Sequence, residues 1–326
     1  MEQHHINWGI IGCGDVTEVK SGPAFSKVVD SSLVAVMRRD VAKAKDYAER
    51  HRVPKWYDDA NALINDPEVN AIYIATPPSS HEAYTIAALK AGKPVYVEKP
   101  MTTDVAAAQR MVDAVKQYKG RLCVAHYRRA QPLFKKIKQL IDEKIIGDTR
   151  FVKLDLYKKL LSAEQLAMPG QAWRVDPAIS GGGLFYDLAP HQLDLMYYFF
   201  GSPGKISGFS INQSGLYNAD DITTGTILFR NGRLFSGSWC FNAAAEAEKD
   251  SCEIIGSAGK ITFSVFQHEP VILTTAAGVE KFEFEPLQHV QQPMIGSVVE
   301  YFLDKAPNPC SVEEGLAVMQ MIAGFK

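Results

Sequence analysis

The sequence predicts an α/β domain with a doubly wound parallel sheet, followed by an α+β domain with a large, mostly antiparallel open sheet. Short apolar strands alternate with amphipathic helical stretches through the first third of the chain, and strand follows strand in the later part. The length of 326 residues also exceeds that of one ordinary core. The rhythm changes near residue 125, so we expect one domain at 1–125 and a second at 126–326.

The first domain is expected to hold five parallel strands with helices between them. The strands are short apolar runs, which are typical of a sheet covered on both faces. They are expected at Ile6–Ile11, Leu33–Arg38, Ala71–Ala75, Val95–Glu98 and Leu122–Ala125. Amphipathic patterns predict helices at Asp15–Val28, Val41–Arg50, Ser80–Ala91 and Asp104–Tyr118, with N-caps at Asp40, Ser79 and Thr103.

The second domain is expected to begin with a helix and then to become strand-rich. The helix Pro132–Lys144 leads into a strand at Arg150–Tyr157, and another helix opens near Gly183. Later strands are expected at Thr224–Phe229, Leu234–Phe241 and Glu253–Ile255, separated by turns at Arg230-Asn231-Gly232 and at 256–259. Hairpin connections make neighbouring strands antiparallel. The helices Met294–Leu303 and Val312–Ala323 close the chain.

Composition excludes several kinds of partner. Lys and Arg total 35 and Asp and Glu total 37, so the net charge of −2 gives no electrostatic footprint for nucleic acid or for an anionic membrane. A local anion site remains open, because local charge is not net charge. No apolar run approaches the ~18–20 residues that span a bilayer. A strand by Ile6 leaves no room for a signal peptide, and five scattered cysteines without CxxC spacing are expected to be reduced and buried. We therefore expect a cytoplasmic protein.

A glycine-rich turn follows the first strand. Gly12 permits a tight turn, and Gly14 lets the backbone approach a pyrophosphate at the start of the next helix. Gly12, Gly14, Asp15 and Val16 are therefore expected to hold a dinucleotide. Thr17 stands where a third glycine is more usual, and the alternative is a tight turn without a cofactor.

The end of the second strand carries Arg38 and Arg39 instead of an acidic residue. A carboxylate there would accept hydrogen bonds from the adenosine ribose and repel a 2′-phosphate. Guanidinium groups suit a phosphate or an adenine face, so NADP is expected in preference to NAD. The alternative is a solvated basic strand end.

Two further strand ends carry polar side chains. Ligands bind at the carboxyl ends of strands in open α/β sheets, so Thr76, Pro77 and His81 are candidate cofactor contacts. Lys99 ends the next strand, where an ammonium would lie beside the nicotinamide and stabilise a developing alkoxide, with Glu98 as its electrostatic partner. The alternative is an exposed Lys-Pro loop with a structural salt bridge.

A second candidate group lies in the segment 181–194. Asp187 and His191 are four residues apart, so on a helix they share a face and could form an acid/base pair. The alternative is a core histidine bonded to a local carboxylate. His191 has no HxxxH or CxxC companion that would suggest a metal site, so we expect no metal.

Four other residues are candidates for binding. Trp173 and Arg174 could contact substrate, although Trp173 could equally be a packing residue. Tyr127 and Arg128 follow the last parallel strand, where Arg128 could hold substrate hydroxyls or cofactor, or could bridge the domains.

Taken together, these segments resemble the Gfo/Idh/MocA family (glucose–fructose oxidoreductase, inositol dehydrogenase, rhizopine catabolism). The similarity covers nearly the whole chain and rests on GIIGCG, ATPPSSH, VEKP, HYRR, the WR pair and GGGLFYDLAPH in this order. The resemblance implies an N-terminal Rossmann domain and a C-terminal domain whose open sheet serves oligomer contacts. It also implies a catalytic site with Lys99 beside the nicotinamide, a cis peptide before Pro100, and Asp187 and His191 facing the substrate.

The resemblance implies an NAD(P)-dependent dehydrogenase or reductase that interconverts a secondary alcohol and a ketone on a sugar, inositol or related polyol. His191 would exchange the hydroxyl proton, assisted by Lys99, with Asp187 orienting His191 or a neighbouring hydroxyl. Two alternatives remain: an NAD-dependent glycosidase with transient redox chemistry, and a non-catalytic NAD(P)- or sugar-binding regulator. We expect a homodimer or homotetramer, because an uncovered sheet face favours association.

Overall fold

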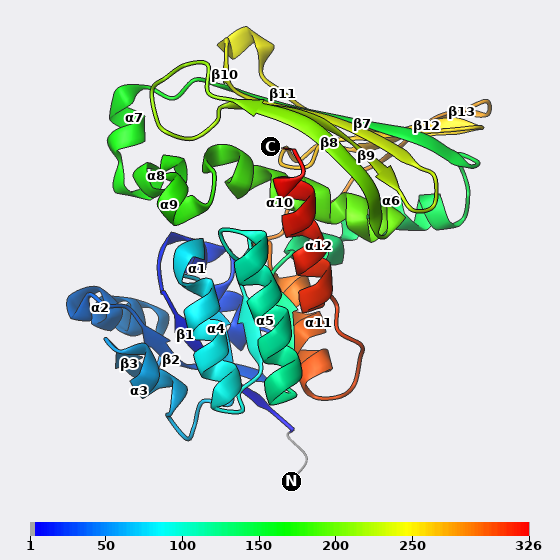
Figure 1. Cartoon of the computed structure of the whole chain (residues 1–326). Coiled ribbons are helices and arrows are strands. Elements are labelled where there is room, and N and C mark those ends of the chain that lie inside the picture. Colours follow the sequence, from blue (N-terminus) through cyan, green and yellow to red (C-terminus); the bar gives the residue numbers. More distant parts are fainter. Residues whose placement is uncertain (1–3, 326) are drawn as a thin grey trace. The chain divides into compact units, whose positions relative to one another are not determined.

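The computed structural model describes residues 4–325, without the side chain of Pro169. The chain forms two compact units (Figure 1). Unit 1 comprises Met1–Ala130 and Leu287–Leu316, and unit 2 comprises Gln131–Pro286 and Ala317–Lys326. The units therefore differ from two contiguous domains in one respect: residues 287–316 return to the first unit, and the rhythm of the sequence gives no sign of this return.

Unit 1 is built on a six-stranded parallel sheet of order β3-β2-β1-β4-β5-β6. The strands are β1 (Ile6–Ile11), β2 (Ser31–Met37), β3 (Lys55–Tyr57), β4 (Ala71–Ile74), β5 (Val95–Val97) and β6 (Leu122–Val124). The order reverses between β1 and β4, and this reversal marks the ligand crevice in doubly wound folds. The predicted parallel sheet is confirmed.

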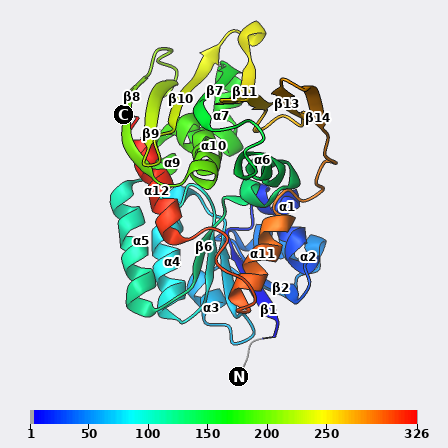
Figure 2. The same cartoon turned by 90° about the vertical axis from the view of Figure 1, so that its right-hand side faces the viewer.

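Helices cover both faces of this sheet. They are α1 (Asp15–Val19), α2 (Val41–His51), α3 (Ala60–Ile64), α4 (His81–Lys90), α5 (Val105–Tyr118) and α11 (Gln292–Phe302), with 3₁₀ turns η1 (Gly22–Ser26), η2 (Pro78–Ser80) and η3 (Tyr127–Ala130). Figure 2 shows α4 and α5 on one side of the sheet and α11 on the other. Trp8 of β1 packs against Phe25 at a ring-centroid distance of 4.8 Å and against Phe302 of α11 at 5.6 Å. The returning segment thus completes the aromatic core of unit 1.

Three details of unit 1 differ from the sequence prediction. The helix expected at Asp15–Val28 is divided into α1 and η1, because Pro23 lacks the N–H that an uninterrupted helix needs. Strand β3 and helix α3 were not predicted, since both are too short for a clear period. Asp40 caps α2 as expected, whereas Ser79 and Thr103 each precede the observed caps, Ser80 and Asp104, by one residue.

Unit 2 is built on an eight-stranded sheet of order β14-β13-β12-β11-β7-β10-β9-β8. The strands are β7 (Thr149–Lys159), β8 (Pro203–Ile211), β9 (Ile222–Phe229), β10 (Leu234–Ala243), β11 (Lys249–Gly256), β12 (Gly259–Phe263), β13 (Val271–Thr275) and β14 (Gly278–Phe282). Only β7 and β10 pair in parallel, and all other pairs are antiparallel. The mostly antiparallel sheet is therefore confirmed.

The helices of unit 2 cover one face of this sheet. The longer ones are α6 (Pro132–Asp142), α10 (Gly183–Phe200) and α12 (Val312–Ala323), the last of which begins in unit 1; the short ones are α7 (Ala163–Ala167), α8 (Pro169–Ala172) and α9 (Pro177–Ser180), with 3₁₀ turns η4 (Trp173–Val175) and η5 (Ala245–Ala247). Phe185 of α10 packs edge-on against Trp239 of β10 at 5.1 Å. Strand β9 alternates buried and exposed residues along its length, as expected for a sheet with one covered face.

The opposite face of the eight-stranded sheet exposes apolar side chains. Phe209 and Ile211 of β8 are 81% and 53% exposed, and Leu228 and Leu234, which pair across β9 and β10, are 41% and 45% exposed. The cross-strand register places Phe209 on the same face as Thr224, and the alternation along β9 then places Leu228 there as well. The sheet is thus open, as predicted.

No helix among residues 4–325 is long and apolar enough to cross a membrane. All five cysteines carry free thiols, four of them buried and Cys240 partly exposed. The described residues include no group of three or more histidine, cysteine or acidic side chains that could hold a metal ion.

Candidate active site

The glycine turn connects β1 to α1 in a conformation that requires glycine at position 12. Gly12 has φ +94°, and a Cβ there would lie 2.7 Å from Thr76 Cγ2 and 2.8 Å from the Thr76 backbone nitrogen. A Cβ at Gly14 would meet no atom within 4 Å, so the space beside this residue is open. Close contact at one glycine and open space at the other suit a turn that admits a ligand beside its backbone.

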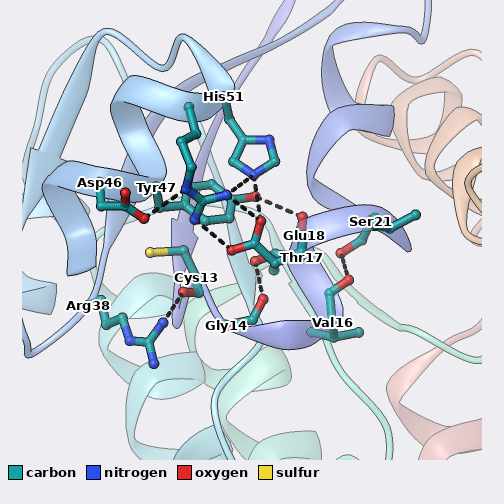
Figure 3. Close-up of polar contacts among 12 residues, drawn as sticks. Cys13, Gly14, Val16, Thr17, Glu18, Ser21, Arg38, Asp46, Tyr47 and His51 are labelled. Carbon is teal, nitrogen blue, oxygen red and sulfur yellow. Dashed lines mark hydrogen bonds and ion pairs between the residues drawn. The ribbon is translucent and has the colours of Figure 1, made fainter.

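Thr17 fits the position where a third glycine is usual. Its hydroxyl donates to the Gly14 carbonyl at 2.7 Å, and its own carbonyl accepts a hydrogen bond from the Tyr47 hydroxyl at 2.8 Å (Figure 3). Burial, which these contacts accompany, raises the pKa of the Tyr47 hydroxyl above its usual range. Thr17 therefore ties the turn to helix α2 while leaving Gly14 open.

A charged cluster ties α1 to the end of α2. The Arg50 guanidinium donates two hydrogen bonds to the Glu18 carboxylate, at 2.8 and 2.9 Å, and His51 Nε2 lies 2.8 Å from the same carboxylate. The Arg50 hydrogen bonds, opposed by partial burial and assisted by His51, lower the pKa of Glu18 to about 2. Glu18 is therefore ionised at neutral pH and holds α1 in place.

Arg38 lies directly beside the glycine turn. Its Nη1 donates to the Cys13 carbonyl at 3.1 Å, as Figure 3 shows. No other hydrogen bond of this guanidinium group is found among the described residues, so its remaining N–H groups are available to a ligand. Arg39 is exposed at the strand end. Burial, opposed by the nearby Arg38 charge, raises the pKa of the Cys13 thiol to about 11, so this thiol stays neutral.

Thr76 and Pro77 follow β4, where Thr76 is partly buried and Pro77 is exposed. Thr76 Oγ1 accepts a hydrogen bond from Ser80 at 2.7 Å. His81 is fully buried, and its two ring nitrogens lie 2.7 Å from the Thr76 carbonyl and 3.1 Å from the Pro100 carbonyl. Its imidazole thus connects the ends of two neighbouring strands, so its place in the fold is structural.

Burial is the main reason why the pKa of His81 falls to about 4; three backbone hydrogen bonds oppose it, and the charge of Lys99 adds to it. His81 is therefore neutral at pH 7. Burial, followed by the charges of Arg129 and Lys99, also lowers the pKa of His126 well below its usual range. The two histidines add no positive charge near Lys99.

Glu98 is buried in a hydrogen-bond network that sequence reasoning missed. Its Oε1 accepts hydrogen bonds from the Tyr73 hydroxyl at 2.5 Å and from Gln291 Nε2 at 2.6 Å, and its Oε2 accepts the Lys99 backbone N–H at 3.1 Å. The Tyr96 hydroxyl donates to Gln291 Oε1 at 3.3 Å. Glu98 was expected mainly as the electrostatic partner of the Lys99 ammonium, whereas the structure shows it oriented by Tyr73 and Gln291.

Lys99 itself is partly exposed at the end of β5, and the Lys99–Pro100 peptide is cis, as the resemblance implied. Tyr127 and Arg128 lie in η3, where Tyr127 is buried and the Arg128 guanidinium lies 5.6 Å from the centre of its ring. Thr76, Lys99 and Tyr127 thus follow three neighbouring parallel strands, β4, β5 and β6, at the same edge of the sheet.

In unit 2, helix α10 begins at Gly183, as predicted, and continues past Pro190. Asp187 and His191 lie one turn apart on it, which places them on the same face. Gly183 has φ +78°, and a Cβ there would clash with Ala219 Cβ, which explains glycine at this position. His191 is 5% exposed, and its ring packs edge-on against Phe266 at 5.8 Å.

Asp187 is paired with Arg174, a contact that sequence reasoning missed. Arg174 Nε donates to Asp187 Oδ2 at 3.1 Å, and its guanidinium stacks 4.7 Å from the Trp173 ring centre. In the sequence, only their opposite charges suggest that these two residues pair. They are 13 residues apart, so the i, i+4 spacing of a helix does not indicate the contact. Trp173, Arg174 and Asp187 therefore form a connected group beside the helix that carries His191.

Comparison with known proteins agrees with both units. A family model described as "Oxidoreductase family, NAD-binding Rossmann fold" matches residues 6–126, and one described as "GFO/IDH/MocA C-terminal domain" matches residues 134–262. The chain is 45% identical to "Oxidoreductase P35" of Formosa agariphila over 99% of both chains. It is 26% identical to myo-inositol 2-dehydrogenase of Thermotoga maritima, over 83% of this chain and 78% of that one.

The fold also matches solved structures. A levoglucosan dehydrogenase, solved in complex with NADH and levoglucosan, superimposes with a TM-score of 0.86 and 21% identity, over 98% of this chain and 96% of that one. At this identity the likeness concerns the fold.

Proposed function

The chain belongs to the Gfo/Idh/MocA oxidoreductase family, and from this premise we propose that it interconverts a secondary alcohol and a ketone on a sugar, inositol or related polyol. The family is that of NAD-binding Rossmann oxidoreductases, and curated relatives include inositol dehydrogenases. The observation that carries the proposal is the group Trp173-Arg174-Asp187 joined to His191 by one turn of α10. An oriented carboxylate and a buried imidazole on one helix face suit proton exchange with a hydroxyl.

The residues of the glycine turn fit a dinucleotide, because Gly14 leaves its backbone open and Gly12 keeps the turn tight. When bound, a nicotinamide cofactor supplies the hydride acceptor or donor. We assign its binding to Gly12, Gly14, Asp15, Val16, Arg38, Arg39, Thr76, Pro77, Glu98, Lys99 and Arg128. His81 contributes by its place between the Thr76 and Pro100 carbonyls, to one of which its neutral imidazole donates a hydrogen bond.

Side chains of the protein transfer the substrate's hydroxyl proton and stabilise negative charge on the substrate oxygen. In oxidation, His191 accepts the hydroxyl proton of the substrate, and in reduction it returns the proton to the developing alkoxide. Asp187, fixed by Arg174, orients His191 or a neighbouring substrate hydroxyl. The Lys99 ammonium stabilises negative charge on the substrate oxygen. Tyr127, Trp173 and Arg174 contribute to substrate binding.

We propose NADP as the preferred cofactor, with NAD as the alternative. The support is Arg38, which directly follows β2, where a carboxylate would contact the adenosine ribose, and which lies against the Cys13 carbonyl with further N–H groups available. A guanidinium group binds the 2′-phosphate of NADP more strongly than it binds the 2′-hydroxyl of NAD. Arg39 follows Arg38 and is exposed, so a second positive charge at the end of β2 is available to the phosphate.

The proposed function is tested by supplying NADP⁺ or NAD⁺ to the purified protein with a panel of sugars, inositols and polyols and recording reduced cofactor. We expect reduction with at least one polyol, and we expect His191→Gln to lower kcat on it by ~10²- to 10⁴-fold. Release of an aglycone from glycosides without net reduction would replace the proposal with the glycosidase alternative. Tight binding of cofactor or sugar without either reaction would favour the alternative of a non-catalytic regulator.

We also propose that the chain forms a homodimer or homotetramer through the open face of the eight-stranded sheet. The exposed apolar residues Phe209, Ile211, Leu228 and Leu234 support this, because a soluble monomer rarely exposes apolar side chains together on one sheet face. A second copy of the same face would cover them.

A further inference from the structure

A tight turn follows β12 and is held by one carboxylate. Asp250 of β11 is 6% exposed, and it accepts hydrogen bonds from three successive backbone N–H groups. These are Val265 at 3.2 Å, Phe266 at 2.6 Å and Gln267 at 3.0 Å. Ser264 adds a bond to the Asp250 carbonyl at 2.8 Å. A buried carboxylate that accepts three N–H bonds fixes the backbone of such a turn closely, because charge-assisted bonds are the strong ones.

The turn presents Phe266 to the imidazole of His191. The two rings lie 5.8 Å apart at an interplanar angle of 77°, which is the edge-to-face geometry that aromatic pairs prefer. His191 is buried on α10, whereas Phe266 is partly exposed. The position of the phenyl ring depends on the backbone at residue 266, whose N–H donates a hydrogen bond to Asp250 Oδ2.

We infer that Asp250 is a positioning residue that acts through Phe266 to fix the orientation of the His191 imidazole. This inference rests on the proposed function, in which His191 exchanges the substrate proton. Proton transfer requires the imidazole nitrogen to stay within hydrogen-bond reach of the hydroxyl, so rotation of the ring lowers turnover without removing any reacting group.

The acceptor capacity of aspartate explains the residue type. Both carboxylate oxygens are used, Oδ1 by Val265 and Oδ2 by Phe266 and Gln267. An asparagine has one acceptor oxygen, and its NH₂ group would face at least one backbone N–H. Asp250→Asn therefore leaves buried donors unpaired and releases the turn that carries Phe266.

The test is a double-mutant cycle on the full-length protein with the substrate found in the polyol panel. We expect Asp250→Asn and Phe266→Leu each to lower kcat about tenfold with the KM for the cofactor unchanged within twofold. Since both act on the same ring, the double variant should be no slower than Phe266→Leu alone. Phe266→Tyr, which keeps the ring, should retain kcat near that of the wild type.

Asp155→Asn is the matched control. Asp155 is also a buried carboxylate in the same sheet, and it binds Lys249 and Tyr157 rather than the 264–267 turn. This control should lose thermal stability and keep kcat. If it lowers kcat as much as Asp250→Asn does, the effect is general destabilisation and the inference is overturned.

A spectroscopic measurement keeps the inference testable independently of turnover. The chain has 8 histidines, so the imidazole C–H resonances of His191 can be assigned by comparison with His191→Gln. Loss of the phenyl ring current in Phe266→Leu and its change in Asp250→Asn should both shift these resonances. A wild-type protein without redox activity would refute the proposed function but would leave this shift to be observed; unshifted resonances, or additive losses in the double variant, would overturn the role of Asp250.

Discussion

Gln291→Leu is the most informative perturbation of unit 1. The side chain is fully buried, donates to Glu98 Oε1 at 2.6 Å and accepts from Tyr96 at 3.3 Å. Leucine has a similar size but can make neither bond. A hydrogen bond to a charged group contributes about 1.5–3 kcal/mol, and the longer bond from Tyr96 contributes about 0.5 kcal/mol. Allowing for the apolar gain of leucine, we expect a loss of about 2 kcal/mol in the free energy of unfolding.

Thermal unfolding followed by circular dichroism measures this loss. For a unit of this size, about 2 kcal/mol corresponds to a fall in Tm of roughly 4–8 °C. Gln292→Leu is the matched control, because Gln292 is partly exposed and makes no side-chain hydrogen bond within residues 4–325. It should leave Tm within about 1–2 °C, since surface substitutions change stability little.

Turnover is the second readout of Gln291→Leu. Glu98 Oε2 holds the Lys99 backbone N–H, so a carboxylate that loses Gln291 should shift Lys99 and lower kcat about tenfold. A Gln291→Leu variant with the Tm and kcat of the wild type would refute the reasoning that this residue orients Glu98.

Four further predictions concern other parts of the molecule. Lys99→Ala should lower kcat far more than it weakens cofactor binding, because the cofactor keeps its other contacts; turnover near that of the wild type would remove Lys99 from the mechanism. Arg38→Ser should raise the KM for NADPH about tenfold or more with little change for NADH, and equal changes for both would argue against phosphate recognition. Phe209→Lys should shift the molar mass in light scattering toward the monomer, whereas an unchanged mass would contradict association through β8. The Glu18 pKa of about 2, against an ordinary 4.5, means that its stabilisation is present above pH 4.5 and is lost as the pH falls toward 2; the Tm difference between the wild type and Glu18→Gln should therefore shrink from pH 5 to pH 3.

Much of the fold could be predicted from the sequence, because local pattern and global structure agree there. The strands of unit 1 are runs of consecutive apolar residues, which is the pattern of a sheet buried on both faces. The turn at Arg230-Asn231-Gly232 connects the antiparallel strands β9 and β10, and its Gly232 has the positive φ that favours glycine. The division of the first helix could not be placed with equal accuracy. Its amphipathic pattern extends across Pro23, so periodicity alone does not show where the missing N–H of proline ends the helix.

The candidate site was predictable where the chemistry lies on one local segment. Lys99 and the Asp187/His191 pair belong to strand ends and helix faces, which periodicity reveals. Gln291 is 193 residues from Glu98, and a buried amide that orients a carboxylate has no periodicity. The same applies to Asp250 and to Arg174, whose partners are chosen by tertiary packing.

The return of residues 287–316 has a consequence for the order in which the chain folds during synthesis. N-terminal domains generally fold first as the ribosome releases them. Here the first unit lacks Gln291, Phe302 and Glu314 until the sheet of the second unit has been made, and these residues bind Glu98, Trp8 and Arg129. At typical rates of elongation the interval is roughly 10–40 s. During it, Trp8 and Glu98 lack their final partners, so the nascent first unit is a natural client for chaperones, and a fragment ending at residue 130 should not fold unless the later segment is supplied.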